Sequence, residues 1–192
     1  NIRSLYLLKL NLPATWFILA AFCLPHSARG EIIQAKMPNG FTSSAEYRDT
    51  GTDRPTLIVV HGFLATREYQ TVARLAAALF DEGYSVLTPT LSLNIDNRKI
   101  SLACEAIHTH TVEDDTKELN YWIQWLNKKG KNKIVLVGHS FGSVTILSYA
   151  LHFNNPTVVK LIAASLVVDE HTLGEKLIAD QIKTAQSLLE KG

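Results

Sequence analysis

A glycine-flanked serine constrains this chain more than any other feature. The run is Gly138-His139-Ser140-Phe141-Gly142; it follows the apolar residues 134–137 and precedes a segment with helical spacing of apolar residues. This setting predicts a tight strand-to-helix turn, because a Cβ at either glycine would collide with neighbouring backbone. Such a turn strains the serine backbone and lifts its hydroxyl above the sheet. The serine is therefore a candidate nucleophile, and the alternative is a glycine-rich turn without a reactive side chain.

Two backbone amides are expected to face that hydroxyl. The N–H of Phe141 lies at the start of the following helix, where unpaired donors and the helix dipole favour negative charge. A second apolar run, Thr56–Val60, predicts a buried parallel strand that ends in His61-Gly62-Phe63. A glycine at that strand end lets the backbone turn toward the nucleophile, so we expect the N–H of Phe63 to be the second donor. Together the two amides would bind an oxyanion.

His61 has two possible roles at this strand end. A histidine before such a glycine more often holds the loop through hydrogen bonds, and this is the role we favour. The alternative is that His61 itself acts as the catalytic base.

With these residues, the chain resembles the amino-terminal part of an α/β-hydrolase over about residues 31–166. The resemblance implies an α/β fold with three layers, in which a mostly parallel sheet has helices on both faces and is incomplete at its carboxyl-terminal end. It does not imply a substrate, because the scaffold hosts esterases, lipases, peptidases, dehalogenases and non-catalytic members.

Alternating patterns place the remaining elements. Further strands are expected at Glu31–Lys36, Thr42–Arg48, 84–88 and 161–168. Pro89 would end the third of these, and the fourth would lie beside the strand that precedes the serine. One helix is expected over 69–80 with Gly83 as its stop, and another from Thr111 to about Gly130. The acidic residues Glu113, Asp114 and Asp115 would cap the second helix rather than act as catalytic acids.

The same patterns predict which side of each helix is buried. Candidate core positions of the first two helices are Tyr69, Val72, Ala73, Ala76, Leu79 and Phe80, and then Leu119, Trp122, Ile123 and Leu126. After the serine turn the helical spacing falls on Val144, Leu147, Ser148 and Leu151, while Gly142 and Ser143 allow close approach to the sheet. A last amphipathic helix is predicted from Leu173 onward, either as the start of a cap over the site or as a core helix.

The long polar segment 90–111 lacks a clear period and is expected to border the mouth of the site. It contains His108 and His110, which indicate either a polar, substrate-facing wall or a metal site. No further pattern completes a ligand set, so we predict no metal and no cofactor.

The catalytic acid and histidine are the gap in this sequence. In α/β-hydrolases they follow the serine in chain order. Here Asp169 is the one candidate acid at a suitable strand end, and His171 stands too near it to reach the serine independently. We therefore expect the chain to be a fragment that is inactive by itself. Its triad histidine would lie beyond Gly192, and so would the acid if Asp169 does not fill that role.

Residues 1–30 differ from the rest. They carry three of the 19 basic residues, none of the 18 acidic ones, and the apolar stretch 16–24 before Ala28-Arg29-Gly30. This pattern is typical of a signal peptide, or alternatively of an uncleaved anchor, and predicts export to the periplasm or medium. The predicted organisation is then 1–30 signal, 31–168 incomplete hydrolase core, and 169–192 cap or following helix.

Charge and motifs together narrow the function. A net charge of +1 without a basic stripe argues against nucleic acid as a partner, and a membrane would be met only through the amino-terminal segment. The resemblance implies cleavage of a small ester-like substrate through an acyl-enzyme on Ser140, and an apolar cap helix would suit a hydrophobic one. Alternatives are a non-catalytic binding protein, or a thioesterase or peptidase on the same scaffold.

Overall fold

The computed structural model describes residues 30–166, 183, 186 and 187. The predictions for the signal segment, Asp169, His171 and most of the last amphipathic helix lie outside these residues. Within the described part, no helix is long and apolar enough to cross a membrane.

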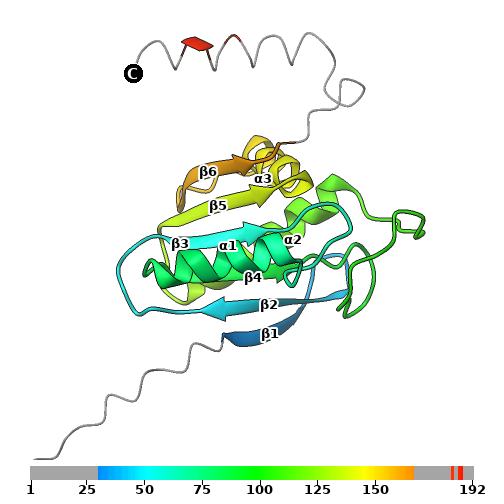
Figure 1. The fold of residues 1–192 in the computed structure, drawn as a ribbon, viewed down its shortest axis with the longest axis horizontal. Helices are drawn as coiled ribbons and strands as arrows, with labels where there is room; N and C mark the ends of the chain where they lie inside the picture. Colours follow the sequence, from blue (N-terminus) through cyan, green and yellow to red (C-terminus); the bar gives the residue numbers. More distant parts are fainter. Residues whose placement is uncertain (1–29, 167–182, 184–185, 188–192) are drawn as a thin grey trace, which may run out of the picture.

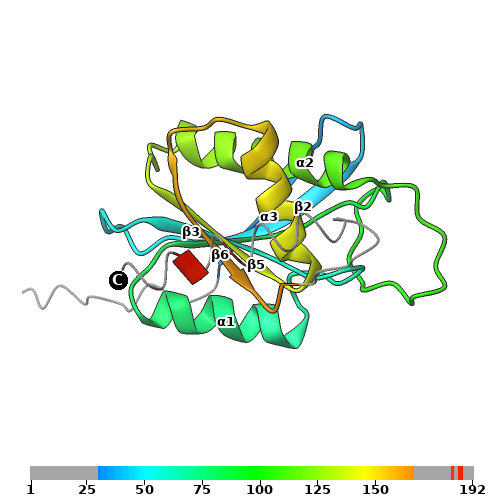
Figure 2. The same cartoon turned by 90° about the horizontal axis from the view of Figure 1, so that it is seen from above.

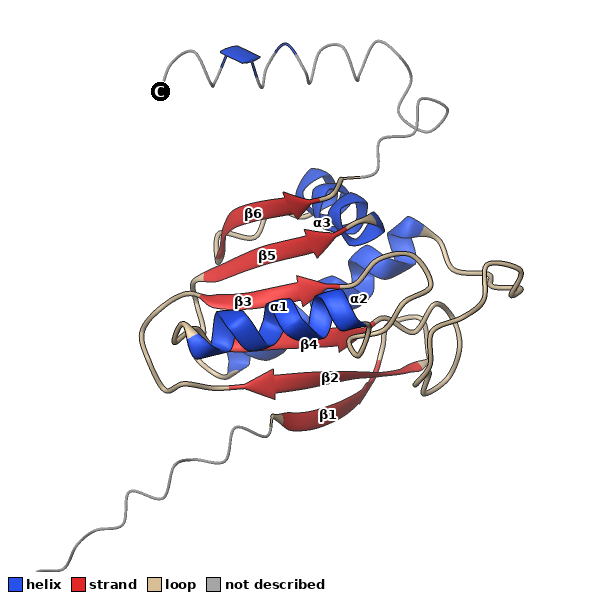
Figure 3. Cartoon of the chain, in the orientation of Figure 1, coloured by secondary structure: helices blue, strands red, loops and turns tan. Residues whose placement is uncertain are grey.

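One sheet organises the described chain. Its strand order is β1-β2-β4-β3-β5-β6 (Figures 1 and 3). The strands are β1 (Glu31–Lys36), β2 (Thr42–Arg48), β3 (Thr56–Val60), β4 (Val86–Thr90), β5 (Ile134–His139) and β6 (Val158–Ala164). β4, β3, β5 and β6 are parallel, whereas β1 and β2 pair antiparallel at one side. The mostly parallel sheet that was predicted is thus confirmed.

Helices cover both faces of the sheet. Helix α1 (Gln70–Asp81) lies on one face, and α2 (Val112–Lys128) and α3 (Phe141–His152) lie on the other (Figure 2). Because successive strand residues point to opposite faces, Leu57 and Val59 pack with the α1 side, whereas Ile58 and Val60 pack with the α2 and α3 side. A strand buried on both faces needs a continuous apolar sequence, as β3 and β5 have.

Helix α2 begins at the predicted residue. The Thr111 hydroxyl accepts from the Asp114 amide at 3.2 Å, and the Asp114 carboxylate accepts from the Thr111 amide at 3.0 Å. This reciprocal pair is a capping box. The predicted apolar face of α2 is fully buried at Leu119, Trp122, Ile123 and Leu126.

Helix α3 buries a different face from the one predicted. Its buried residues are Gly142, Ser143, Thr145, Ile146 and Tyr149, whereas Leu151 is 85% exposed. The spacing of Val144, Leu147 and Leu151 was therefore misleading. The turn sets the phase of the helix, because the first small residues after the serine must touch the sheet, and residues three and four positions further follow them into the core.

Two strand boundaries also differ from the sequence prediction. Pro89 does not end β4 but lies within it, opposite Ala45 of β2. By that point β4 has separated from β3, since they pair only at Leu57↔Val86 and Ile58↔Leu87, and the missing amide interrupts no β3–β4 pair. Strand β6 spans Val158–Ala164 rather than 161–168, and it lies beside β5 as predicted.

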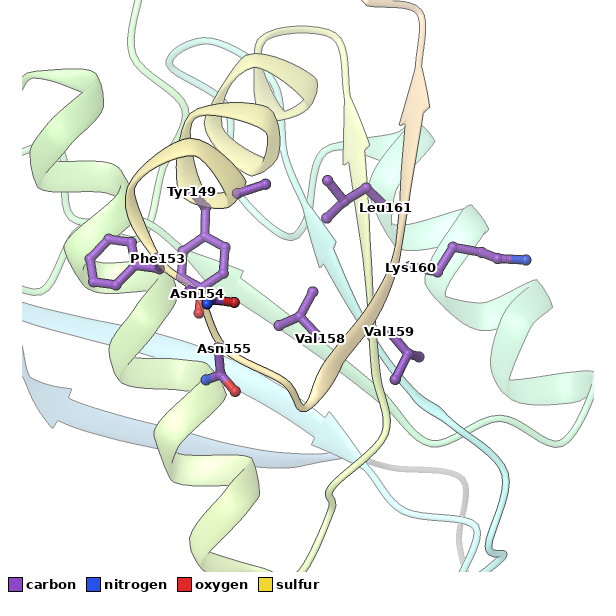
Figure 4. Close-up of a pocket in the computed structure, with 9 residues that line it drawn as sticks. Tyr149, Phe153, Asn154, Asn155, Val158, Val159, Lys160 and Leu161 are labelled. Atoms are coloured by element: carbon purple, nitrogen blue, oxygen red, sulfur yellow. The ribbon is translucent and has the colours of Figure 1, made fainter. Parts of the chain in front are cut away.

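The loops that matter for function gather at the carboxyl ends of the parallel strands. Residues 61–65, which we call the β3 loop, leave β3 there, and the segment 91–111 extends from the same edge (Figure 1). A separate cleft of about 250 Å³ lies at the opposite edge, between the end of α3 and the start of β6 (Figure 4). Its lining includes Tyr149, Asn155, Val158 and Lys160, so this cleft is remote from the serine turn.

Candidate active site

Ser140 sits at a strained bend between β5 and α3. Its φ of 54° and ψ of −124° are unfavourable for a residue with a Cβ. The flanking glycines explain how the bend fits. A Cβ added to Gly138 would lie 2.5 Å from the Ser143 nitrogen, and one added to Gly142 would lie 2.5 Å from the Val60 carbonyl oxygen. Strand and helix therefore approach at backbone contact distance, as the sequence predicted.

Neighbouring backbone holds this conformation in place. The Ser140 amide donates to the Ala164 carbonyl of β6 at 2.9 Å, and the Ser143 amide donates to the Ser140 carbonyl at 2.9 Å. The Ser143 hydroxyl adds a bond to the Gly138 carbonyl at 2.8 Å. Because its backbone groups are bonded and its side chain is only half-buried, Ser140 is rigid yet open on one side.

The β3 loop lies directly against Ser140. A Cβ placed on Gly62 would be 3.2 Å from the Ser140 Cβ and 3.5 Å from its Oγ. Neither the Phe63 amide nor the Phe141 amide donates a hydrogen bond to another described residue. Their rings meet edge to face, with centroids 5.5 Å apart. The two predicted donors are thus on neighbouring segments beside the serine, and their N–H groups are not taken by the rest of the described chain.

His61 is buried and fixed in one tautomer. Its Nε2 accepts a hydrogen bond from the Leu91 amide at 3.0 Å, so its Nδ1 carries the proton and donates to the Gly62 carbonyl at 2.8 Å. Burial, with smaller contributions from Arg98 and His110, lowers the pKa of His61 to about 3. A neutral imidazole with both nitrogens bonded supports the loop-holding role and not that of a base.

Aromatic rings continue across the mouth of the site from the 91–111 segment. The His108 ring packs edge to face on Phe63 at 5.5 Å, and the His110 ring follows at 4.7 Å from His108. His110 Nε2 in turn lies 3.7 Å from a carboxylate oxygen of Asp115. This segment therefore does border the serine turn.

Burial favours the neutral forms of both His110 and Asp115. Burial chiefly lowers the pKa of His110, and burial with the nearby Glu118 raises the pKa of Asp115 well above its usual value. Asp115 belongs to the acidic trio that was assigned to capping. Only Asp114 caps, whereas Asp115 turns inward, because it lies one turn before Leu119 on the buried face of α2.

The described residues contain no group of three or more histidine, cysteine or acidic side chains arranged to hold a metal ion. Cys104 is exposed and unpaired in the described part of the chain.

Behind the β3 loop the space is only about 10 Å³, bounded in part by Phe63, His110, Asp115 and Phe141. The space behind the loop is therefore too small for a ligand-sized molecule.

Three other residues complete the description of the predicted site. His139 is half-buried next to Ser140, and its Nδ1 has no partner among the described residues. His152 is exposed at the far end of α3, where its ring bonds the Ser148 carbonyl at 2.7 Å. Asp169, the candidate acid, lies outside the described residues.

Sequence reasoning missed two buried charged residues near the site. Arg98 is 5% exposed and bonds backbone carbonyls of the β3 loop. Glu118 of α2 accepts from the Ser92 amide at 2.9 Å and from Asn39 Nδ2 at 2.8 Å, and burial raises its pKa. One signal was available for Glu118, since it stands one turn before Trp122 on the apolar face of α2.

Comparison with known proteins places this geometry in a family. A family model described as the alpha/beta hydrolase fold matches residues 55–187. No curated protein matches the chain. Among solved structures, an esterase of Pyrococcus furiosus is similar, with a TM-score of 0.61 and 20% identity over 77% of this chain and 55% of that one.

Two further solved structures are similar to the chain. An epoxide hydrolase of Vigna radiata has a TM-score of 0.53 and 20% identity, over 70% of this chain and 38% of its own. An alpha-beta serine hydrolase homologue of Coxiella burnetii has a TM-score of 0.52 and 19% identity, over 69% of this chain and 61% of its own. Such identities establish a shared fold alone. The chain spans about half the length of the esterase, at 55%.

Proposed function

The chain belongs to the α/β hydrolase fold family, and on this premise we propose that it is a serine hydrolase that cleaves a carboxylic ester through an acyl-enzyme on Ser140. One observation carries the proposal: Ser140 is held at φ 54° against the β3 loop, beside two amides that no described residue occupies. Strain of this kind persists only where surrounding structure maintains it, and it is characteristic of functional sites.

The mechanism follows from the positions of these groups. The Ser140 hydroxyl attacks the ester carbonyl, and the N–H groups of Phe63 and Phe141 stabilise the negative charge on the carbonyl oxygen. Loss of the alcohol leaves an acyl-enzyme, which water then hydrolyses. Each such donor contributes on the order of 3 kcal/mol to transition-state stabilisation.

A histidine outside the described residues is proposed to accept the serine proton. His61 is unsuited because both of its ring nitrogens are bonded, and His152 lies at the other edge of the sheet. An acid would orient that histidine, and Asp169 remains a candidate for it.

The nucleophile favours acyl transfer over other chemistry on this scaffold. Esterases and epoxide hydrolases are both similar to the chain, so the fold does not discriminate between them. A serine hydroxyl beside two amide donors suits a tetrahedral intermediate with a developing oxyanion, which forms when a carbonyl is attacked.

The rim of the site favours a hydrophobic substrate. Phe63 is 48% exposed, and its ring lies between those of Phe141 and His108. Aromatic rings left exposed around a polar centre favour apolar contact with a ligand. We therefore propose a small ester with an apolar acyl or alcohol group, with His108 forming part of the wall.

Replacing the nucleophile tests the proposal directly. In the full gene product, Ser140→Ala should lower kcat for p-nitrophenyl butyrate by a factor on the order of 10⁴ or more, because the attacking atom is removed. A fluorophosphonate probe should label the unmodified protein at Ser140 alone. Ser148→Ala, on the same helix, is the control and should keep activity and labelling.

A substrate panel distinguishes the remaining alternatives. Faster turnover of acyl thioesters or aminoacyl amides than of esters would assign a thioesterase or a peptidase on the same serine. If Ser140→Ala retains ester hydrolysis, or the probe fails to react with the full gene product, the site is a binding site rather than a catalytic one.

A further inference from the structure

A buried arginine lies behind the β3 loop. Arg98 is 5% exposed and belongs to the 91–111 segment. Its Nη2 donates to the Ala65 carbonyl at 2.8 Å and its Nη1 to the Leu64 carbonyl at 3.3 Å. Nη2 and Nε also donate to the Leu91 carbonyl, at 2.7 Å and 3.0 Å, and Nη1 donates to the Ile100 carbonyl at 3.1 Å. One guanidinium thus ties the loop to the end of β4 and to its own segment.

This cation is balanced by carbonyl dipoles. Among the described ion pairs none includes Arg98, although Asp115 and Glu118 are near enough to act on its charge. Burial lowers the pKa of Arg98 to about 10, so it stays protonated at neutral pH. A buried charge is costly unless its hydrogen bonds are satisfied, and a planar fork with five donors can reach these four carbonyls together.

The residue that Arg98 holds is strained. Leu64 has a φ of 53°, in the left-handed region that branched side chains rarely adopt. Its carbonyl is bonded twice, by Arg98 Nη1 and by the Leu102 amide at 2.9 Å. Without these two donors, relaxation of Leu64 to an ordinary φ would be energetically favourable.

Two peptide planes connect Leu64 to the amide beside the serine. The Leu64 carbonyl shares a peptide plane with the Ala65 N–H, and that N–H donates to the Gly62 carbonyl at 3.2 Å. The Gly62 carbonyl shares its own plane with the Phe63 N–H, which points the opposite way. Fixing one end of each plane therefore fixes the direction of the Phe63 N–H.

We propose that Arg98 is a positioning residue, which aims the Phe63 amide at the developing oxyanion by holding the Leu64 and Ala65 carbonyls. The inference rests on the proposed function, because it assumes that an oxyanion forms beside Ser140. It adds a residue that never touches the substrate yet controls stabilisation of the transition state.

The test uses Arg98→Met and Arg98→Lys in the full gene product, with p-nitrophenyl butyrate as substrate. Methionine fills much of the space and removes all five donors. We expect kcat to fall about 10- to 100-fold, short of the 10²- to 10³-fold loss typical when an oxyanion donor is removed. KM should stay within about threefold, because the amide acts mainly in the transition state. Lysine keeps the charge but not the fork, so its kcat should be intermediate.

A transition-state analogue separates positioning from a general structural effect. A butyl trifluoromethyl ketone forms a hemiketal with the serine, and its oxyanion occupies the same position. Its inhibition constant should rise in each variant by the same factor by which kcat/KM falls. A protein that was merely destabilised, with a smaller active fraction, would lose kcat while the inhibition constant of that fraction stayed unchanged.

Arg54→Met is the matched control. Arg54 is exposed before β3, where its guanidinium bonds the Glu82 carbonyl and lies 3.6 Å over the Tyr84 ring. It is also an arginine bonded to a carbonyl, but it stands at the opposite end of β3 from His61. This variant should keep kcat and the inhibition constant within twofold.

A kcat within twofold of the unmodified protein in either folded Arg98 variant would overturn the inference, as would an unchanged inhibition constant. If Arg98→Met does not fold, the same criteria apply to Arg98→Lys, which retains the buried cation. Failure of the proposed function is recognised separately, because Ser140→Ala would then retain activity whatever the Arg98 variants do.

Discussion

Neutral imidazole is the form in which His61 stabilises the β3 loop. Its Nδ1–H donates to the Gly62 carbonyl and its Nε2 accepts from the Leu91 amide. Protonation would place a second hydrogen on Nε2, facing the Leu91 amide that now donates to it. Because the ring is also buried, the charged form is disfavoured twice, which agrees with a pKa of about 3.

This depressed pKa predicts a loss of stability in acid. Between the unfolded pKa near 6.5 and the folded value of about 3, the unfolded state binds the extra proton, so the free energy of unfolding falls as pH decreases through this window. The contribution of His61 is up to about 1.4 kcal/mol per pH unit. Urea unfolding of the full gene product near pH 7 and near pH 5 should show a smaller loss for His61→Gln than for the unmodified protein.

Other buried groups also contribute to the pH dependence of the free energy of unfolding, so the test compares this dependence between the variant and the unmodified protein. The lowered pKa of His110 also reduces the free energy of unfolding as pH falls. The raised pKa values of Asp115 and Glu118 have the opposite effect and increase it. His152→Gln removes an exposed imidazole and should keep the pH dependence of the unmodified protein. Parallel pH dependences for His61→Gln and the unmodified protein would contradict the neutral, loop-holding assignment.

Single residues differ in how far the sequence could identify them. Ser140 and Gly62 were singled out because the sequence pattern that marks each of them lies in its immediate neighbours in the chain. Arg98 was not, because its partners in the β3 loop are distant: it bonds the Leu64 and Ala65 carbonyls from more than thirty positions away. No local pattern distinguishes such an arginine from a solvated one.

At the scale of elements, the close approach of α3 to both β5 and β3 depends on glycine. The Cβ positions of Gly138 and Gly142 are filled by backbone atoms, which cannot move as a flexible side chain would. The same contact sets the phase of α3, so its buried face follows from the turn and not from the spacing of its larger apolar residues.

Gly138→Ala should therefore be strongly destabilising. The added methyl would stand 2.5 Å from the Ser143 nitrogen, and we expect a loss of at least about 3 kcal/mol or failure to fold. Gly130→Ala is the control, since its methyl meets nothing within 4 Å and only its φ of +80° is unfavourable. That variant should lose about 1–2 kcal/mol. Equal losses in thermal or urea unfolding would show that the approach at the turn is not tight.

At the scale of the molecule, stability is concentrated in the middle of the sheet. Strands β3 and β5 are buried almost throughout and lie between helical layers, whereas β1 is a largely exposed outer strand. Ser140 follows β5 and the β3 loop follows β3. The site is thus built on two strands of the buried middle of the sheet, which suits a site that must resist relaxation of strained residues.

Amide hydrogen exchange should reveal this gradient. Amides of Ile58, Val59 and Leu136 should exchange only through global unfolding and show a strong dependence on denaturant. Amides of Ile33 and Ala35 in β1 should exchange at least about 100-fold faster through local opening, with little such dependence. Equal protection in β1 and β3 would contradict the gradient.

The sequence by itself determined the layered α/β fold and its strand-to-helix turn, because alternation, buried apolar runs and glycine spacing are local consequences of backbone geometry. It also indicated that Ser140 and the amides of Phe63 and Phe141 would face one another, since parallel strands end at a common edge. Only the tertiary structure decided which face of α3 is buried, that Pro89 lies within β4, and that Arg98 holds the β3 loop. Those outcomes depend on contacts between segments far apart in the chain, where the close approach of backbones and the satisfaction of buried polar groups override local preference.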